Sequence, residues 1–165
     1  MVSIDRVFVA LGSNLDQPER QIGIALEALS GLPGTQVLRS SSLYRTPPWG
    51  DTDQPEFINA VARLATPLQP LALLDALLAI ERRMGRVRTR RYGPRVIDLD
   101  LLMHGESLVH SERLVLPHPR MQERAFVMWP LAEIAPTLSL GAFGTAADIA
   151  AALPGEGILR LPAGG

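Results

Sequence analysis

The order in which strand-like and helix-like segments alternate limits the folds open to this chain more than any other feature. Four segments have strand composition, and two place apolar residues at helical spacing. In chain order, these six segments cover residues 6–11, 17–30, 36–45, 57–64, 70–83 and 96–103. The order is therefore strand, helix, strand, strand, helix, strand.

This β-α-β-β-α-β order predicts an α+β fold, a ferredoxin-like sandwich with helices on one face of a mainly antiparallel sheet. A small C-terminal appendix follows it. After the last strand, we expect a hairpin over residues 106–116. A helix over residues 124–135 should follow, with a kink at Pro130. Asp16 and Glu19 have the spacing of a capping box, which predicts that the first helix starts directly after Asp16.

Length and charge indicate one ordinary globular domain. The 165 residues suffice for a single domain, residues 1–165, and no linker or internal repeat divides them. The 16 basic and 17 acidic residues nearly cancel, so net charge provides no general attraction to nucleic acid or to membranes. The sequence shows no signal peptide and no apolar run of about 18 residues. We therefore expect a soluble, cytoplasmic protein.

Two missing residue types exclude several kinds of chemistry. All 16 basic residues are Arg, and the chain contains neither Lys nor Cys. A Schiff base and a Walker A phosphate site both require Lys, so both are excluded. Without Cys there is no thiolate nucleophile, no disulfide and no thiolate zinc site.

The segment around Asp98 and Asp100 is the strongest candidate for chemistry. Strand alternation places both carboxylates on one face, with Cα atoms roughly 6–7 Å apart. The apolar residues expected on the opposite face, under the helices, are Ile97, Leu99, Leu101 and Met103. Two carboxylates that point the same way repel each other unless a cation neutralises them, and oxygen ligands favour Mg²⁺. A solvated strand face with two acids is the alternative.

An arginine-rich segment precedes this strand. Between Arg82 and Arg95 there are seven Arg in 14 residues and no acidic residue. Arginine binds phosphate groups in a bidentate manner, so the segment indicates a polyanionic ligand. The alternative is an ordinary solvated loop. Phosphates together with Mg²⁺ would satisfy both the arginines and the two carboxylates.

Four further residues carry open interpretations. Glu81 continues an apolar stripe at the end of the second helix, so it is either a partner for nearby arginines or a group that faces a ligand. His118 lies between two prolines, and the sequence allows either a structural turn or a phosphate ligand. His104 and His110 are expected at the surface.

Seven motifs follow one another in an order that resembles a known enzyme family. They are Gly12–Asn14, Tyr44–Gly50, Gln54–Ala60, Glu81–Arg86, Tyr92–Asp100, Leu116–Met121 and Arg124–Phe126. Over about residues 5–135, the chain resembles the 6-hydroxymethyl-7,8-dihydropterin pyrophosphokinases. The resemblance implies transfer of pyrophosphate from ATP to the hydroxymethyl group of the pterin, with release of AMP, in folate biosynthesis.

The resemblance also implies roles for individual residues. Asp98 and Asp100 match the ligands of two Mg²⁺ ions that bridge the triphosphate and the acceptor hydroxyl. Arg86 and Arg95 resemble the mobile-loop arginines that neutralise the transferring phosphates. The positions that match ATP-binding residues are Glu81, Arg88, Arg113, His118 and Arg124. The positions that match the pterin pocket are Thr46, Pro47, Trp49, Phe57, Asn59, Tyr92 and Phe126.

Some positions depart from the family pattern. Phe57 replaces a frequent Tyr, and Leu78 stands where some members have a Gln that faces the nucleotide. The loop before Tyr92 is a residue shorter than in some members, so Arg90 and Arg91 have no aligned role. The acceptor of the hydroxyl proton stays open between Asp100 and a water, and we expect a monomer.

A ferredoxin-like RNA-binding module is the rival interpretation, with the arginine-rich segment on backbone phosphates. Such a module needs exposed aromatic residues on the sheet, whereas aromatic residues make up only 5% of this chain. Asp98 and Asp100 would also repel a phosphate backbone. The enzyme is therefore the favoured interpretation.

Overall fold

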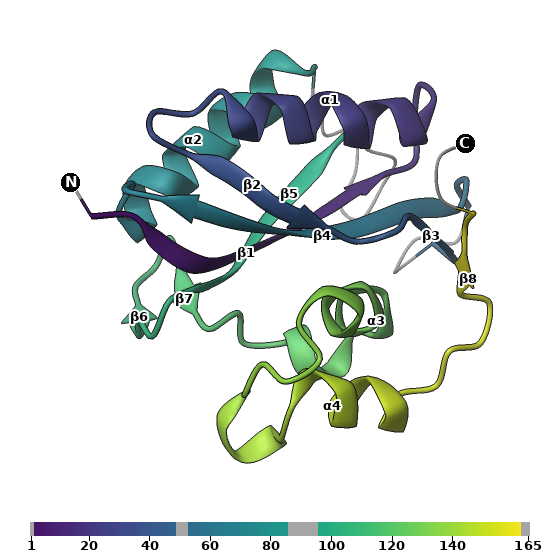
Figure 1. Cartoon of the computed structure of the whole chain (residues 1–165). Helices are drawn as coiled ribbons and strands as arrows, with labels where there is room; N and C mark the ends of the chain where they lie inside the picture. The colour runs from purple at the N-terminus through teal and green to yellow at the C-terminus, as the bar shows by residue number, and fades with distance from the viewer. Residues whose placement is uncertain (1, 49–52, 86–95, 163–165) are drawn as a thin grey trace.

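A computed structural model of the chain describes residues 2–48, 53–85 and 96–162. One main sheet lies between two layers of helices (Figure 1). The strands are β1 (Ile4–Ser13), β2 (Gln36–Ser40), β3 (Tyr44–Thr46), β4 (Phe57–Thr66), β5 (Asp98–His104), β6 (Val109–His110), β7 (Val115–Leu116) and β8 (Leu159–Arg160). The helices are α1 (Pro18–Ser30), α2 (Pro70–Arg83), α3 (Ala125–Ile134) and α4 (Ala146–Ala152), with short 3-10 turns at Met121–Glu123 and Gly141–Phe143. Of the helices described, none is both long enough and apolar enough to cross a bilayer.

The main sheet is antiparallel, as the sequence predicts. Its strands follow the order β5-β1-β4-β3-β8, and β2 also pairs with β4. The single strand expected over residues 36–45 is two strands, β2 and β3, on the same partner. Ser41 lies between them, and its Oγ accepts a hydrogen bond from the Val61 backbone N–H at 3.0 Å. This side-chain contact replaces a ladder bond and interrupts the strand.

Helices cover both faces of the sheet, whereas the sequence predicts helices on one face only. The α1 and α2 helices lie on one face, and α3 with α4 lies on the other (Figure 1). The reason is visible in β4, where residues 58–62 are buried without alternation. A strand that is buried on both faces needs a helical layer on each side.

The strand β5 departs from simple alternation near its end. Leu99 and Leu101 pack in the cluster under α1 and α2, as expected, but Met103 packs with Leu102 against the α3 side. The pairing of β1 with β5 shifts register between Phe8 and Val9. A bulge of this kind changes the side of the sheet to which the following residues point, so the prediction for Met103 is wrong.

The start of α1 also differs from the prediction. The helix begins at Pro18, and Gln17 rather than Asp16 is its N-cap residue. Asp16 and Gln17 both have left-handed backbone angles, with φ of 54° and 62°. The chain therefore turns sharply before Pro18, and the capping box predicted for Asp16 and Glu19 does not form between these described residues.

The C-terminal part forms a layer of its own and then returns to the sheet. The expected hairpin is present as β6 and β7, and the expected helix is present as α3 with Pro130 inside it. The α4 helix packs against α3, and the chain then reaches the outer edge of β3 as β8. The sequence predicts the appendix but not this return to the sheet.

Candidate functional site

Asp98 and Asp100 begin β5 on the face that α3 partly covers. Asp98 is half-buried, Asp100 is exposed, and Leu99 between them is buried under α2. In the register of the sheet, Asp98 lies opposite Gly12 and Asp100 lies opposite Ala10 of β1. The residues opposite the two carboxylates are therefore both small. Strand alternation correctly predicts that the two acids share a face.

Glu81 supports this pair from the other side of the sheet. Its side chain is 4% exposed, at the end of α2. Its Oε2 accepts a hydrogen bond from the Leu99 backbone N–H at 2.8 Å. A buried carboxylate needs such hydrogen bonds to offset the loss of solvation. The contact fixes the backbone between Asp98 and Asp100, a role that the sequence does not indicate.

A second polar group lies in the same row of the sheet. Asn59 of β4 and Asp98 of β5 both lie opposite Gly12. The Asn59 Nδ2 donates to Thr46 Oγ1 at 2.6 Å, and both side chains are buried. This bond uses one N–H of the amide, so the other N–H and the carbonyl oxygen can bind a donor–acceptor edge. Asn59 is therefore oriented before any ligand binds.

Gly12 is a candidate functional position that the sequence marks only as part of a motif. A Cβ at this residue would lie 2.8 Å from Asn59 Oδ1. Only glycine leaves the amide in its present place. A glycine inside an otherwise apolar strand is a recognised sign of close approach, and it could have identified this position.

Two half-buried aromatic residues, Phe57 and Phe126, belong to elements on this face. Phe57 begins β4, lies opposite Thr46 in the ladder and is half-buried. Phe126 is half-buried in the first turn of α3, and the Arg124 guanidinium lies 5.7 Å from the centre of its ring. Pro47 directly follows β3 and is exposed. The structure thus brings residues predicted for the pterin pocket to one face of the sheet.

His118 lies close enough to Asp100 for the two side chains to interact electrostatically. Its backbone N–H donates to the Leu102 carbonyl at 2.9 Å, and its Nδ1 accepts from the Arg120 N–H at 3.2 Å. Burial lowers the pKa of His118 below its ordinary value of 6.5; the Asp100 carboxylate opposes this shift, while Arg124 and Arg120 add to it. Burial therefore favours the neutral form of the imidazole. With Nδ1 as an acceptor, the remaining proton is on Nε2.

Two other described residues predicted to bind ATP, Arg124 and Arg113, have different partners. Arg124 is half-buried before α3 and influences His118 electrostatically. Arg113 instead forms an ion pair with Asp75 of α2, and both side chains are more than half exposed.

The two remaining histidines differ from each other. His110 is exposed, as expected. His104, expected at the surface, is buried, and its Nε2 lies 2.7 Å from the Leu68 carbonyl. It lies after the bulge in β5, so simple alternation does not predict its side. The prediction for His104 is wrong.

Several predicted site residues lie outside the described residues. These are Trp49, Arg86, Arg88, Tyr92 and Arg95, together with the unassigned Arg90 and Arg91. Their roles stay predictions.

The donor set on β5 suits one kind of metal. Within residues 2–48, 53–85 and 96–162, no group of three or more His, Cys, Asp or Glu side chains gathers around a point. Zinc and other structural metals usually require three or four protein ligands. Mg²⁺ commonly takes one or two carboxylates and completes its shell with water and substrate phosphates. Asp98 and Asp100 fit the second pattern.

A family match and two relatives of this chain carry the same kind of name. The family described as 7,8-dihydro-6-hydroxymethylpterin-pyrophosphokinase (HPPK) matches residues 8–136. A Pseudomonas aeruginosa relative, named 2-amino-4-hydroxy-6-hydroxymethyldihydropteridine pyrophosphokinase, is 54% identical over 159 residues, which cover 96% of this chain and 98% of the relative. A Haemophilus influenzae relative of the same name is 49% identical over 133 residues, which cover 81% of this chain and 83% of the relative.

A solved structure has a similar fold. It is the Plasmodium falciparum HPPK-DHPS triple mutant with pteroate, with a TM-score of 0.75 and 14% sequence identity. The match covers 97% of this chain and 47% of that longer chain.

Proposed function

Since the chain belongs to the 7,8-dihydro-6-hydroxymethylpterin-pyrophosphokinase family, we propose that the face of the sheet with Asp98, Asp100 and Asn59 is its active site. The protein is a pyrophosphokinase of folate biosynthesis and transfers pyrophosphate from ATP to 6-hydroxymethyl-7,8-dihydropterin, with release of AMP. Because the chain belongs to this enzyme family, the enzyme is preferred to the RNA-binding alternative. The observation that carries the assignment of the site is the single row of the sheet that holds Asp98, Gly12 and Asn59.

The pterin binds at the Asn59 end of this row. A pterin is flat and has a donor–acceptor edge, and an oriented amide such as Asn59 can both donate to it and accept from it. Phe57 and Phe126 provide aromatic surfaces for the ring, and Thr46 and Pro47 complete the described part of the pocket. Trp49 and Tyr92 are predicted to cover it.

The phosphates of ATP bind at the carboxylate end. Mg²⁺, two ions by family resemblance, would be held by Asp98 and Asp100 and would supply charge neutralisation for the triphosphate. Arg86 and Arg95 neutralise the transferring group, and Arg88, Arg113 and Arg124 bind the nucleotide. The neutral His118 donates a hydrogen bond to a phosphate oxygen from Nε2.

The reaction is a displacement at the β-phosphorus of ATP. The pterin hydroxyl oxygen forms a bond to this phosphorus while the bond to the oxygen bridging the α- and β-phosphates breaks. That oxygen leaves with AMP, and the hydroxyl proton passes to Asp100 or to a water. Alignment of the two substrates and neutralisation of charge are the main requirements for such a transfer.

Glu81 acts through the backbone of β5. Its hydrogen bond with the Leu99 N–H holds the peptide that separates Asp98 from Asp100. Glu81→Gln keeps an acceptor at this place, whereas Glu81→Leu removes it. We expect kcat to fall more in Glu81→Leu than in Glu81→Gln. Equal KM increases for ATP in both variants would instead support direct contact with the nucleotide.

Three finer features belong to the same proposal. The strand order β5-β1-β4-β3, with α1 and α2 on one face, supports a ferredoxin-like core. We further propose that the enzyme is a monomer and acts in the cytoplasm.

An isotope experiment tests the proposed reaction directly. With ATP labelled at the γ-phosphate, the label should appear in the pterin diphosphate while unlabelled AMP is released. Chelation of divalent cations should stop the transfer, and added Mg²⁺ should restore it. Labelled inorganic phosphate as the sole product would contradict pyrophosphoryl transfer, and full activity without a divalent cation would contradict the role of Asp98 and Asp100.

A further inference from the structure

The chain after α4 returns to the sheet beside the proposed pterin pocket. We name residues 153–161 the return segment. Its strand β8 pairs with β3, with Tyr44 opposite Arg160 and Arg45 opposite Leu159. The Leu161 N–H then donates to the Leu43 carbonyl at 2.8 Å. The three-residue strand β3 is thus held by β4 on one side and by the return segment on the other.

The return segment also contacts Pro47, the residue after β3. A Cβ on Gly157 would lie 2.8 Å from Pro47 Cγ, and Gly157 has a φ of 78°. Both facts require glycine, because a side chain would strain the backbone and push against the proline ring. The neighbour of Pro47 is Thr46, which accepts the hydrogen bond from Asn59. The segment therefore touches the wall of the proposed pocket.

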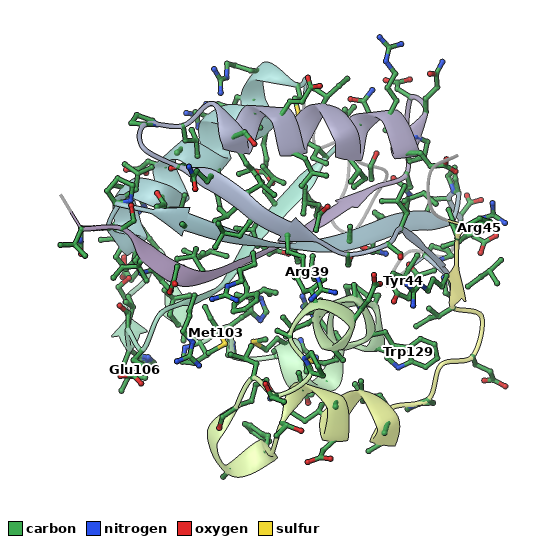
Figure 2. The ribbon with its side chains drawn as sticks, viewed as in Figure 1. Arg39, Tyr44, Arg45, Met103, Glu106 and Trp129 are labelled. Atoms are coloured by element: carbon green, nitrogen blue, oxygen red, sulfur yellow. The ribbon has the colours of Figure 1, made fainter. Side chains whose placement is uncertain are left out.

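A second contact ties the segment to α3. A Cβ on Gly155 would lie 1.9 Å from the Trp129 ring, and the Trp129 Nε1 donates to the Ala150 carbonyl at 3.2 Å. Figure 2 shows Trp129 between α3 and the chain that leads to β8. Trp129 lies one turn along α3 from Phe126. The return segment thus packs against β3 and α3, two of the elements that carry proposed pocket residues.

One carboxylate joins these elements. Glu133 of α3 accepts hydrogen bonds from the Ser42 backbone and side chain and, at 2.7 Å, from the Tyr44 hydroxyl. Arg160 of β8 lies 3.4 Å from the same carboxylate and donates to Ser42 Oγ at 3.1 Å. Together with the two glycine contacts, this network sets the distance between β3 and α3.

We propose that the return segment is a positioning element for the pterin, and that it tunes pterin affinity by holding Thr46 and Pro47 relative to Phe126. The inference rests on the proposed pterin pocket. The segment lies beyond residue 136, where the family match ends. The Pseudomonas aeruginosa match covers 96% of this chain, whereas the Haemophilus influenzae match covers 81%.

Two glycine substitutions in the full-length enzyme distinguish an effect on the position of Pro47 from an effect of backbone strain alone. Gly157→Ala forces a methyl group against Pro47. Gly141→Ala is the matched control, because Gly141 also has a positive φ, 62°, but no described atom lies within 4 Å of its Cβ position. We expect Gly157→Ala to raise the KM for the pterin by about fivefold or more, with the KM for ATP and kcat within about twofold of wild type. Gly141→Ala should leave all three parameters unchanged.

Equal pterin KM values in the two variants would overturn the inference. If Gly157→Ala does not fold, Arg160→Ala tests the same idea from an exposed position. It should raise the pterin KM more than Arg160→Lys does, and an unchanged KM in both would again overturn the inference. Asn59→Ala distinguishes the underlying proposal: unchanged pterin binding there rejects the pocket itself, whereas weaker binding there with no effect at Gly157 and Arg160 rejects only the return segment.

Discussion

The two faces of the sheet are built from the same strands but present different chemistry. Under α1 and α2, the strands present buried apolar residues such as Val9, Leu11 and Leu101. On the opposite face, Phe8 and Leu102 are buried in the cluster with α3, while polar or small residues form the row at the other end. The comparison teaches that both faces contribute buried apolar clusters to the fold, whereas only the α3 face also carries the polar row that we propose as the substrate site.

Removal of one carboxylate should give the largest effect on activity. Asp98→Asn or Asp100→Asn removes a negative charge that would hold Mg²⁺, so kcat should fall by about a thousandfold or more. In Asp100→Asn the free energy of unfolding should stay equal or rise, because Asp98 loses a like-charged neighbour. Steady-state assays and denaturant unfolding check both expectations.

Asp148→Asn is the control for this pair, because Asp148 is an exposed acid on α4. It should leave kcat unchanged. Activity within about tenfold of wild type in both Asp98→Asn and Asp100→Asn would contradict the assignment of the active face.

A cavity on the face that α1 and α2 cover should lower stability and leave activity unchanged. Leu77 of α2 is fully buried under the sheet. Leu77→Ala should lower the free energy of unfolding by about 2–5 kcal/mol, because it leaves a cavity in a close-packed core. At temperatures where the variant stays folded, kcat and both KM values should change little. A large loss of kcat in folded protein would mean that the two faces are not separable.

A methyl group at Gly12 sharpens the comparison within the active face. Gly12→Ala forces the Asn59 amide to move, since the added Cβ would lie 2.8 Å from its Oδ1. The pterin KM should rise by about tenfold, with a smaller effect on ATP. In Gly23→Ala on α1, the added Cβ meets no described atom within 4 Å, so stability should rise by about 0.5–1 kcal/mol and kinetics should not change. The reverse ranking of the two variants in pterin KM would reject the role of Gly12.

The smallest expected effect is on the pH dependence of the free energy of unfolding. It arises at the junction of β3, α3 and β8. Burial acts to raise the pKa of Glu133, but hydrogen bonds from Tyr44 and Ser42 and the charge of Arg160 outweigh it and lower the pKa below 4.5. A lowered folded-state pKa stabilises the fold above pH about 4.5, and this stabilisation is lost as the pH falls through the folded-state pKa. Glu133→Gln should therefore lose less stability than wild type on acidification.

Unfolding experiments between pH 7 and pH 3 measure this difference. At pH 7 the variant should be less stable by about 1–3 kcal/mol, since hydrogen bonds to a charged group are lost. Parallel pH profiles for the two proteins would contradict the account of this junction.

Local periodicity predicts much of the fold and the shared face of Asp98 and Asp100. The alternation from Ile97 to Leu101 correctly separates the apolar residues from Asp98 and Asp100. The expected limits of α2 agree with the structure because Pro70 occupies its first turn and Gly85, with a φ of 85°, follows its end. Such signals depend on neighbouring residues, so a single sequence contains them.

Features that depend on distant contacts are the ones that the sequence does not predict. The bulge in the pairing of β1 with β5 determines the sides of Met103 and His104, and register is a property of two strands. The same holds for the hydrogen bond of Glu81 with Leu99, which joins residues 18 apart in sequence, and for the return of β8 to β3. Family resemblance identifies Glu81 and Asn59, but only the structure shows which contacts they make.

Sequential calorimetric titration tests the central claim most directly. A non-hydrolysable ATP analogue with Mg²⁺ would be added first, followed by 6-hydroxymethyl-7,8-dihydropterin, to wild type, Asp98→Asn and Asn59→Ala. The account predicts that Asp98→Asn loses Mg²⁺-dependent nucleotide binding, whereas Asn59→Ala keeps it and loses tight binding of the pterin. Nucleotide binding that is independent of Mg²⁺ and unchanged in Asp98→Asn would contradict the account.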